Sequence, residues 1–141
     1  MDRAQITLVR ASFNRLSPNA AALAARFYSR LFELDPALRP LFHGDMAKQG
    51  LKLMTTLQLA IGALDDVARI VPALEHLART HLGYGVRDEH YATVGAALLD
   101  ALADAEGAAF SPELRAAWAA AYGLLSEVMR EAAAGAGRRA A

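Results

Sequence analysis

Residues 72–86, PALEHLARTHLGYGV, form the most informative stretch of the chain. Leu74, Leu77 and His81 are spaced three and four residues apart, which places them on one face of an α-helix. Two glycines then end this helix, because glycine readily adopts left-handed backbone conformations. The stretch therefore predicts an amphipathic helix that carries a histidine on its apolar face, just before a break in the chain.

The remainder of the 141-residue chain has the same helical character. Alanine and leucine dominate, no segment alternates with period two, and Asp, Ser and Pro residues divide the apolar stripes. Asp2, Asp45 and Asp88 are the expected N-caps, and Pro72 marks a restart near the first turn of its helix. The expected helices cover residues 2–16, 17–34, 35–40, 45–64, 65–82, 88–104 and 111–131. The sequence thus predicts an all-α domain of seven to eight helices over residues 1–131, followed by a frayed tail at 132–141.

Composition excludes several classes of function. Fifteen basic residues balance fifteen acidic ones, so no net field attracts nucleic acid or anionic lipid. The absence of cysteine excludes disulfides, thiolate metal sites and cysteine nucleophiles. No apolar run approaches the ~18 residues of a membrane span, and the first residues do not resemble a secretory signal. Zinc-protease, dinucleotide-binding, Walker and nucleophile-elbow motifs are also missing. We expect a cytoplasmic protein with no nucleic-acid or membrane partner.

Three polar side chains interrupt apolar helix faces. His81 is either a core histidine bonded to a carbonyl, the commoner case, or a metal ligand, since neutral imidazole binds iron or zinc well. Gln49 lies four residues before Leu53 on an apolar seam, where it either turns inward or reaches water at the edge. Tyr28 shares a face with other apolar residues, and half-buried tyrosines are ordinary. Taken singly, none of the three identifies a site.

Glycines inside predicted helices are also informative, because each lowers helix stability by about 1 kcal/mol relative to alanine. Gly50 is explained if another helix crosses closely, with Ala24 as the matching small residue. Gly95 and Gly123 are candidates for the same role in the last two helices. The alternative is that these glycines have no structural role and reflect only a chain rich in alanine and glycine.

Several segments, taken in order and spacing, resemble the globins. Specifically, they resemble the bacterial single-domain globins related to the haem domain of flavohaemoglobins, over about residues 3–131. The interval from Gln49 to His81 matches that group without a gap. The segments are FYSRLF at 27–32, PAL at 36–38 with LF at 41–42, QGLKL at 49–53, ARTHLGYGV at 78–86, HYATVG at 90–95 and AWAAAYG at 117–123.

The resemblance implies a haem b cofactor and a role for each matching residue. His81 would be the proximal metal ligand, with Tyr28 and Gln49 on the open side of the iron and Tyr91 supporting the histidine. Lys52 would face a haem propionate. The apolar walls of the haem site would be Phe42, Leu53, Leu57, Leu77, Val86 and Val94.

The same resemblance implies binding of O2, NO and CO, with tight O2 binding and slow release. Detoxification of NO to nitrate is then the expected chemistry, and we expect a monomer or weak homodimer. Alternatives are peroxidase or nitrite reductase activity, gas sensing, or a haem-free helical signalling module. His43, next to Phe42, is a candidate intruder at the iron.

The chain departs from the flavohaemoglobin pattern in one respect. The glutamate that the family places against the proximal histidine falls on Gly135, and Glu131 lies one turn earlier as a candidate substitute. We expect no flavin or nicotinamide domain after the globin-like region. Any NO dioxygenase activity is therefore expected to need an external reductase.

Overall fold

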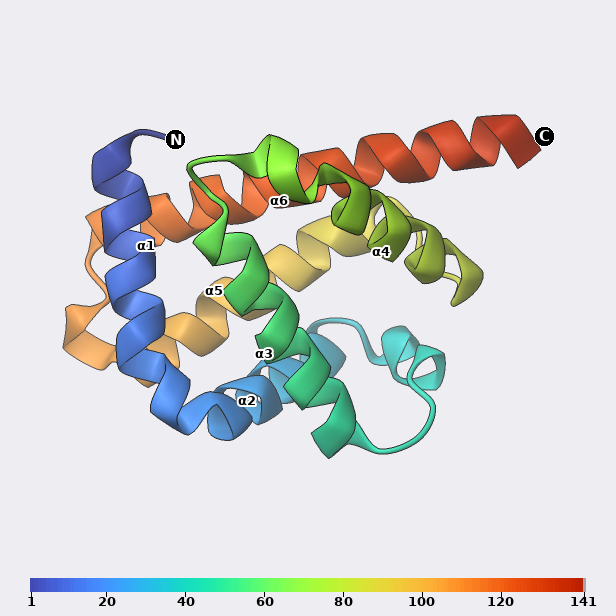
Figure 1. The fold of residues 1–141 in the computed structure, drawn as a ribbon. Helices are drawn as coiled ribbons and strands as arrows, with labels where there is room; N and C mark the ends of the chain where they lie inside the picture. The colour runs from blue at the N-terminus through green and yellow to red at the C-terminus, as the bar shows by residue number, and fades with distance from the viewer. Residues whose placement is uncertain (141) are drawn as a thin grey trace.

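The computed structural model describes the backbone of residues 1–140 and the side-chain surroundings of residues 1–135. The described backbone is entirely helical apart from turns and short loops, so the predicted all-α class is confirmed. The expected seven to eight helices are found as six α-helices and four short 3-10 helices (Figure 1). They are α1 Arg3–Leu16, η1 Ser17–Asn19, α2 Ala20–Leu34, η2 Pro36–Leu41, α3 Met46–Gly62, η3 Val67–Ile70, α4 Val71–Gly83, α5 His90–Glu106, η4 Gly107–Ala109 and α6 Pro112–Ala140.

Side-chain caps begin several of these helices as the sequence predicts. The Asp2 carboxylate accepts a hydrogen bond from the backbone N–H of Gln5 at 2.8 Å, and Gln5 completes a capping box. Asp45 accepts from the N–H of Ala47 at 2.8 Å at the start of α3. Each cap satisfies a backbone donor that has no partner inside the helix.

Asp88, in contrast, does not cap α5. The N-cap residue is Glu89, which makes no side-chain cap bond. Asp88 instead accepts two hydrogen bonds from the guanidinium of Arg130 on α6, at 2.8 and 2.9 Å. Local sequence could not reveal this partner, because it lies forty-two positions further along the chain.

The two ends of the last helix also differ in how well they were predicted. Ser111 accepts from the N–H of Leu114 at 3.1 Å, which confirms the predicted start. The sequence predicted a frayed tail from residue 132, whereas the backbone stays helical as far as Ala140. Residue 141 lies outside the described residues. Across the described residues no helix is long and apolar enough to cross a membrane.

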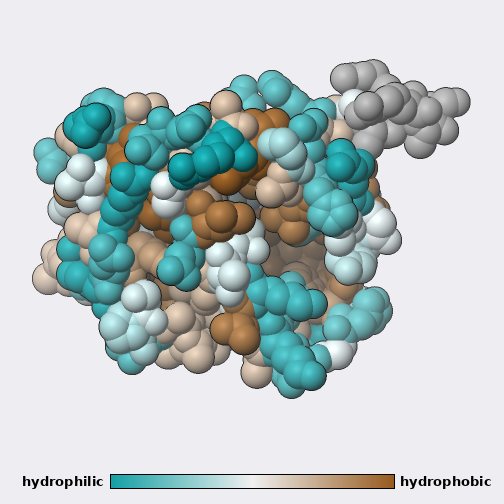
Figure 2. Space-filling view, viewed as in Figure 1, coloured by the Kyte–Doolittle hydropathy of each residue, from teal (hydrophilic) through white to brown (hydrophobic). Residues whose placement is uncertain are grey.

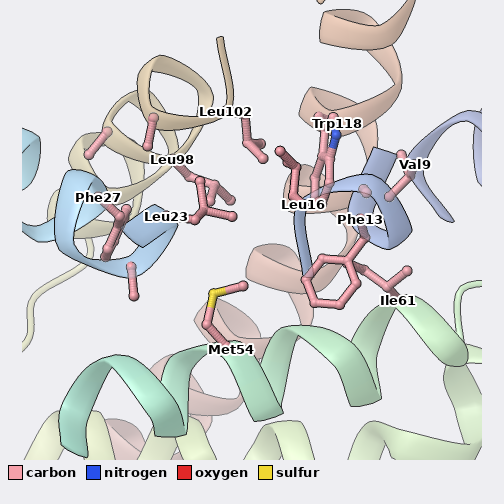
Figure 3. Close-up of a cluster of buried hydrophobic side chains, with 14 of the residues drawn as sticks. Val9, Phe13, Leu16, Leu23, Phe27, Met54, Ile61, Leu98, Leu102 and Trp118 are labelled. Atoms are coloured by element: carbon pink, nitrogen blue, oxygen red, sulfur yellow. The ribbon is translucent and has the colours of Figure 1, made fainter. Parts of the chain in front are cut away.

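The main core lies where α1, α2, α5 and α6 meet, with α3 closing one side (Figure 3). Leu31, Leu102 and Val9 are almost completely buried, and Trp118 belongs to the same cluster. Burial of each such side chain contributes about 1.5–3 kcal/mol relative to exposure. This cluster fixes the helices whose other faces carry the site.

A buried polar chain links three helices within this core. The indole N–H of Trp118 donates to the Ser12 hydroxyl at 3.0 Å, and Ser12 donates to Glu106 at 3.1 Å. The Glu106 carboxylate, only 4% exposed, is also paired with the guanidinium of Arg15. These partners offset the cost of burying the Glu106 charge, which would be high if the carboxylate had no partner.

Helix α4 is held differently from the other helices. It packs along α6, whereas α3 packs along α2, and among the described residues α3 and α4 share no extensive contact. Figure 1 shows α3 and α4 diverging from the region near η3. The fold therefore brings α3, α4, η2 and α5 around one region of the molecule without packing them tightly together.

Candidate functional site

The surface is hollowed between α3 and α4, and brown, hydrophobic residues line the recess (Figure 2). Six apolar side chains proposed from the sequence as cofactor contacts lie on the elements around it. All six are half-buried, the exposure expected for side chains at the wall of a recess. They are Phe42 after η2, Leu53 and Leu57 on α3, Leu77 on α4, Val86 at the α4–α5 corner and Val94 on α5.

His81 lies on the last turn of α4 and is half-buried. Its Nδ1 atom is 2.7 Å from the carbonyl oxygen of Leu77, one turn earlier in the same helix. Because a carbonyl only accepts, Nδ1 carries the proton and Nε2 keeps its lone pair in the neutral ring. A hydrogen bond of this kind orients a metal-binding histidine and fixes its tautomer. The bond to a carbonyl, one of the two alternatives from the sequence, is therefore present, and it is compatible with the other alternative, a metal ligand.

Tyr28 and Gln49 are brought together from α2 and α3. Tyr28 is buried, and its burial raises the pKa of the phenol, while the neighbouring Gln49 side chain opposes that rise. Gln49 is half-buried and not fully solvated. The inward orientation of Gln49, one of two alternatives from its sequence position, is therefore supported by its contact with Tyr28.

Aromatic rings surround Tyr28 on the side of η2. The ring centroid of Phe42 lies 5.4 Å from that of Tyr28 and 5.3 Å from that of Phe32, both in edge-to-face geometry. Such pairs contribute about 0.5–1.5 kcal/mol beyond their area burial. The rings fix Tyr28 and Phe42 relative to each other, although they are fourteen residues apart in sequence.

Gly50 explains how α2 and α3 approach closely enough for this contact. A Cβ atom added at Gly50 would lie 3.0 Å from the Cβ of Ala24, tighter than ordinary packing. The predicted crossing of two helices at Gly50 and Ala24 is confirmed. Gly95 also adjoins α6, but through the ring of Tyr122, whereas a Cβ at Gly123 would meet nothing within 4 Å.

Comparison with known proteins identifies the family. The Globin family model matches residues 25–129, which is most of the chain. The chain belongs to the globin family.

Curated and solved relatives agree with this assignment. A flavohemoprotein of Bordetella parapertussis is 37% identical over 126 residues, covering 86% of this chain and 31% of the relative. The globin thus spans about a third of the length of these flavohemoproteins. A neuroglobin of Dissostichus mawsoni is 31% identical and is covered over 87% of its length, with 88% of this chain.

Two solved structures share the fold over nearly their whole length. A bacterial globin from Campylobacter jejuni superposes with a TM-score of 0.87 at 24% identity, covering 97% of this chain and 99% of that one. An engineered carbene transferase, from a candidate nitric oxide dioxygenase of Rhodothermus marinus, superposes with a TM-score of 0.89 at 28% identity, covering 98% and 96%. The expected resemblance to bacterial single-domain globins is confirmed.

The globin family and the flavohemoprotein relatives imply a haem cofactor, and the residues present fit one. His81 offers a free Nε2, which is a common ligand of haem iron. Half-buried apolar residues on four elements offer walls for a flat macrocycle. Among the described residues no group of three His, Cys, Asp or Glu side chains could hold a bare metal ion.

The remaining site residues are placed less centrally. Lys52 is exposed on α3, and within residues 1–135 it forms no ion pair. His43 is exposed in the loop before α3. Tyr91 is buried, but its hydroxyl makes no hydrogen bond to His81, whose imidazole is bonded to Leu77. Glu131 is exposed on α6, and in the described part of the chain no carboxylate bonds to His81.

The corner that follows His81 is anchored to α6 by contacts that the sequence did not reveal. The Tyr122 hydroxyl donates to the carbonyl of Tyr91 at 2.6 Å, and Arg130 holds Asp88. Within the corner, the N–H of Val86 donates to the carbonyl of His81 at 3.0 Å. The backbone of His81 is therefore linked to α6 through the hydrogen bond to Val86 and the ion pair between Asp88 and Arg130.

Proposed function

We propose that this globin binds O2 through haem b, releases it slowly, and uses it to convert NO to nitrate with electrons from a separate reductase. NO and CO are the other expected ligands. The proposal gives Tyr28 and Gln49 the central part, because they place two hydrogen-bond donors beside one another at an otherwise apolar site.

The pairing of Tyr28 with Gln49 carries the proposal. Haem iron supplies the coordination position for a diatomic gas and the electrons exchanged with it. The protein supplies the donors: burial raises the pKa of Tyr28, so its hydroxyl keeps its proton, and the Gln49 side chain lies beside it. A protonated phenol and an amide N–H both donate to a ligand that gains negative charge.

These donors act differently on different gases. A hydrogen bond to a charged acceptor contributes about 1.5–3 kcal/mol, and the apolar surroundings strengthen it. O2 gains more charge than CO, so the same donors retain O2 preferentially. The expected result is slow O2 release, which suits a reaction on the retained gas better than its delivery.

The other proposed roles are those that the likeness to the globins implies. His81 would hold the iron through Nε2, and Phe42, Leu53, Leu57, Leu77, Val86 and Val94 would line the walls around the porphyrin. Tyr91 would support the proximal side without a direct hydrogen bond to His81, and the exposed Lys52 would pair with a propionate.

One solved relative supports NO as the second reactant: the engineered carbene transferase comes from a candidate nitric oxide dioxygenase. The flavohemoproteins, which match the globin over most of its chain, support a reductase as its partner. The reaction joins NO to O2 and takes up one electron, which gives nitrate. A reductase must supply that electron in each cycle.

A two-stage experiment tests the proposal. The ferrous protein, equilibrated with O2, is mixed with one equivalent of NO in a stopped-flow spectrometer, and nitrate is measured afterwards. One nitrate per haem is expected, with the ferric spectrum appearing during mixing. Sustained nitrate production with an added reductase would establish turnover, whereas slow reaction and no nitrate would assign the protein to O2 binding alone.

A further inference from the structure

The α4–α5 corner, residues 82–89, follows directly on His81, and all its residues except Val86 are exposed. Its own hydrogen bonds are local: the N–H of Val86 donates to the carbonyl of His81 at 3.0 Å, and the N–H of Arg87 donates to Nδ1 of His90 at 2.9 Å. A segment with few buried side chains is weakly held by apolar packing. The position of this corner therefore depends on contacts made by its polar residues.

An ion pair connects the corner to α6. Nε and Nη2 of Arg130 donate to the two carboxylate oxygens of Asp88 at 2.8 and 2.9 Å. This two-bond geometry is the most directional form of an arginine–carboxylate pair. The two side chains are 50% and 66% exposed, so solvent and salt weaken the attraction between them. The pair is therefore suited to fixing the position of the corner and contributes little to the stability of the whole fold.

Arg130 lies on a part of α6 that is itself well anchored. Its neighbours Val128 and Met129 pack against a buried cluster that includes Leu74, near the start of α4. Apolar packing thus holds the first turns of α4 against α6. The ion pair holds the corner at the other end of α4 against the same helix.

The ion pair also lies beside a tyrosine of the proposed haem site. Burial raises the pKa of the Tyr91 phenol, the charge of Asp88 raises it further, and the charge of Arg130 opposes the rise. The Tyr91 carbonyl accepts a hydrogen bond from Tyr122 on α6 at 2.6 Å. Within residues 1–135 no carboxylate bonds to His81 itself. The charged link between α6 and His81 therefore runs through the corner.

We propose that Asp88 and Arg130 are positioning residues, which clamp the α4–α5 corner to α6 and thereby keep His81 in one orientation toward the haem. The inference rests on the proposed function, which makes His81 the iron ligand. It gives an exposed ion pair a part in haem retention, because the end of α4 must move before the His81 imidazole can leave the iron. We call this pair the Asp88–Arg130 clamp.

Arg130→Gln tests the clamp, with Arg87→Gln as its matched control. Arg87 also pairs with a carboxylate, but its partner Glu89 lies within the same corner. The rate of haem transfer from the ferric protein to excess apomyoglobin is measured for each variant. Arg130→Gln should lose haem about two- to fivefold faster than the parent, the range of a well-formed exposed ion pair. Arg87→Gln should match the parent, and equal rates in the two variants would overturn the proposal.

Further variants show whether the ion pair itself is responsible. Arg130→Lys keeps the charge but loses the planar fork of the guanidinium, so its rate should lie between those of the parent and Arg130→Gln. Asp88→Asn combined with Arg130→Gln should lose haem no faster than either single variant, because each removes the same interaction. The difference between the parent and Arg130→Gln should also shrink in about 1 M salt. Fully additive effects of the two substitutions would reject the clamp.

Hydrogen exchange tests the corner without relying on haem. The amides of residues 84–91 should exchange about two- to fivefold faster in Arg130→Gln than in the parent, with or without haem, while those of α1 should not change. Unchanged exchange at the corner, or equally faster exchange in α1, would refute the clamp. A protein that takes up no haem would contradict the proposed function and leave this measurement decisive for the clamp.

Discussion

The Nδ1 atom of His81 lies 2.7 Å from the carbonyl oxygen of Leu77, which leaves Nε2 as the ligand atom of the ring. We expect His81→Ala to lose most of its haem absorbance after reconstitution with haemin, because no other described side chain offers the same ligand. Added imidazole should restore part of this absorbance. His76→Ala, which changes an exposed histidine on the same helix, should take up as much haem as the parent. Equal haem uptake in both variants would contradict the assignment.

Replacement of Tyr28 tests the donor at the gas site. Tyr28→Phe should accelerate O2 dissociation about ten- to a hundredfold, because it removes one hydrogen bond of about 1.5–3 kcal/mol. CO dissociation should change much less. Stopped-flow ligand replacement measures both rates, and Tyr84→Phe, at a tyrosine that is 61% exposed, is the control. Equal acceleration for both gases would reject the hydrogen-bond mechanism.

The ferrous protein without an added gas should show a five-coordinate, high-spin absorption spectrum. His43 is exposed, so we expect no second imidazole at the iron. His43→Ala should therefore leave the spectrum unchanged. Low-spin, six-coordinate bands that vanish in His43→Ala would show that this histidine does reach the iron.

Gly95 and Gly123 should respond oppositely to alanine. At Gly95 the new Cβ would lie 2.7 Å from the Tyr122 ring, which its 2.6 Å hydrogen bond to the Tyr91 carbonyl holds in place. Overpacking of this kind costs about 1–3 kcal/mol. At Gly123 the methyl group meets open space, so Gly123→Ala should gain up to about 1 kcal/mol from helix propensity. Urea unfolding of both variants measures the difference.

The buried carboxylate of Glu106 should make stability depend on acid pH. Its hydrogen bonds with Arg15 and Ser12 lower its pKa below the usual 4.5. The ionised pair therefore stabilises the fold fully above about pH 4.5, and this contribution is lost as the pH falls through the lowered pKa. Glu106→Gln should have a lower free energy of unfolding than the parent at neutral pH, and the difference between the two proteins should become smaller in acid. A difference that stays constant from pH 7 to about pH 3 would show that ionisation of Glu106 does not contribute to stability.

Local patterns in the sequence predicted the helices and drew attention to polar residues on apolar faces, because each depends on neighbours along one helix. The cap at Asp45, the glycine at the α2–α3 crossing and the inward His81 are of this kind. The roles expected of those polar residues at a haem came from the resemblance to the globins. Ser12 carried a similar signal, since it lies between Val9 and Leu16 on an apolar face, but it was overlooked. Its partners Trp118 and Glu106 then follow only from the fold.

Long-range pairing explains what the sequence could not show. Asp88 looks like a cap from its neighbours, yet Arg130 binds it from another helix. Arg10 likewise donates to the carbonyls of Ile61 and Gly62 at the end of α3, and pairs with Asp65. Nothing along one helix specifies such partners, because they depend on how the helices pack.

The separate placement of α4, which packs on α6 and hardly on α3, has a consequence for how this scaffold can diversify. Four of the six apolar side chains that border the recess, Phe42, Leu53, Leu57 and Val94, pack against the core that contains Trp118, whereas Leu77 and Val86 belong to the α4 side. Substitutions at the first four should therefore disturb the interior as well as the recess. Changes at Leu77 and Val86 can alter the recess with less effect on the stability of the fold.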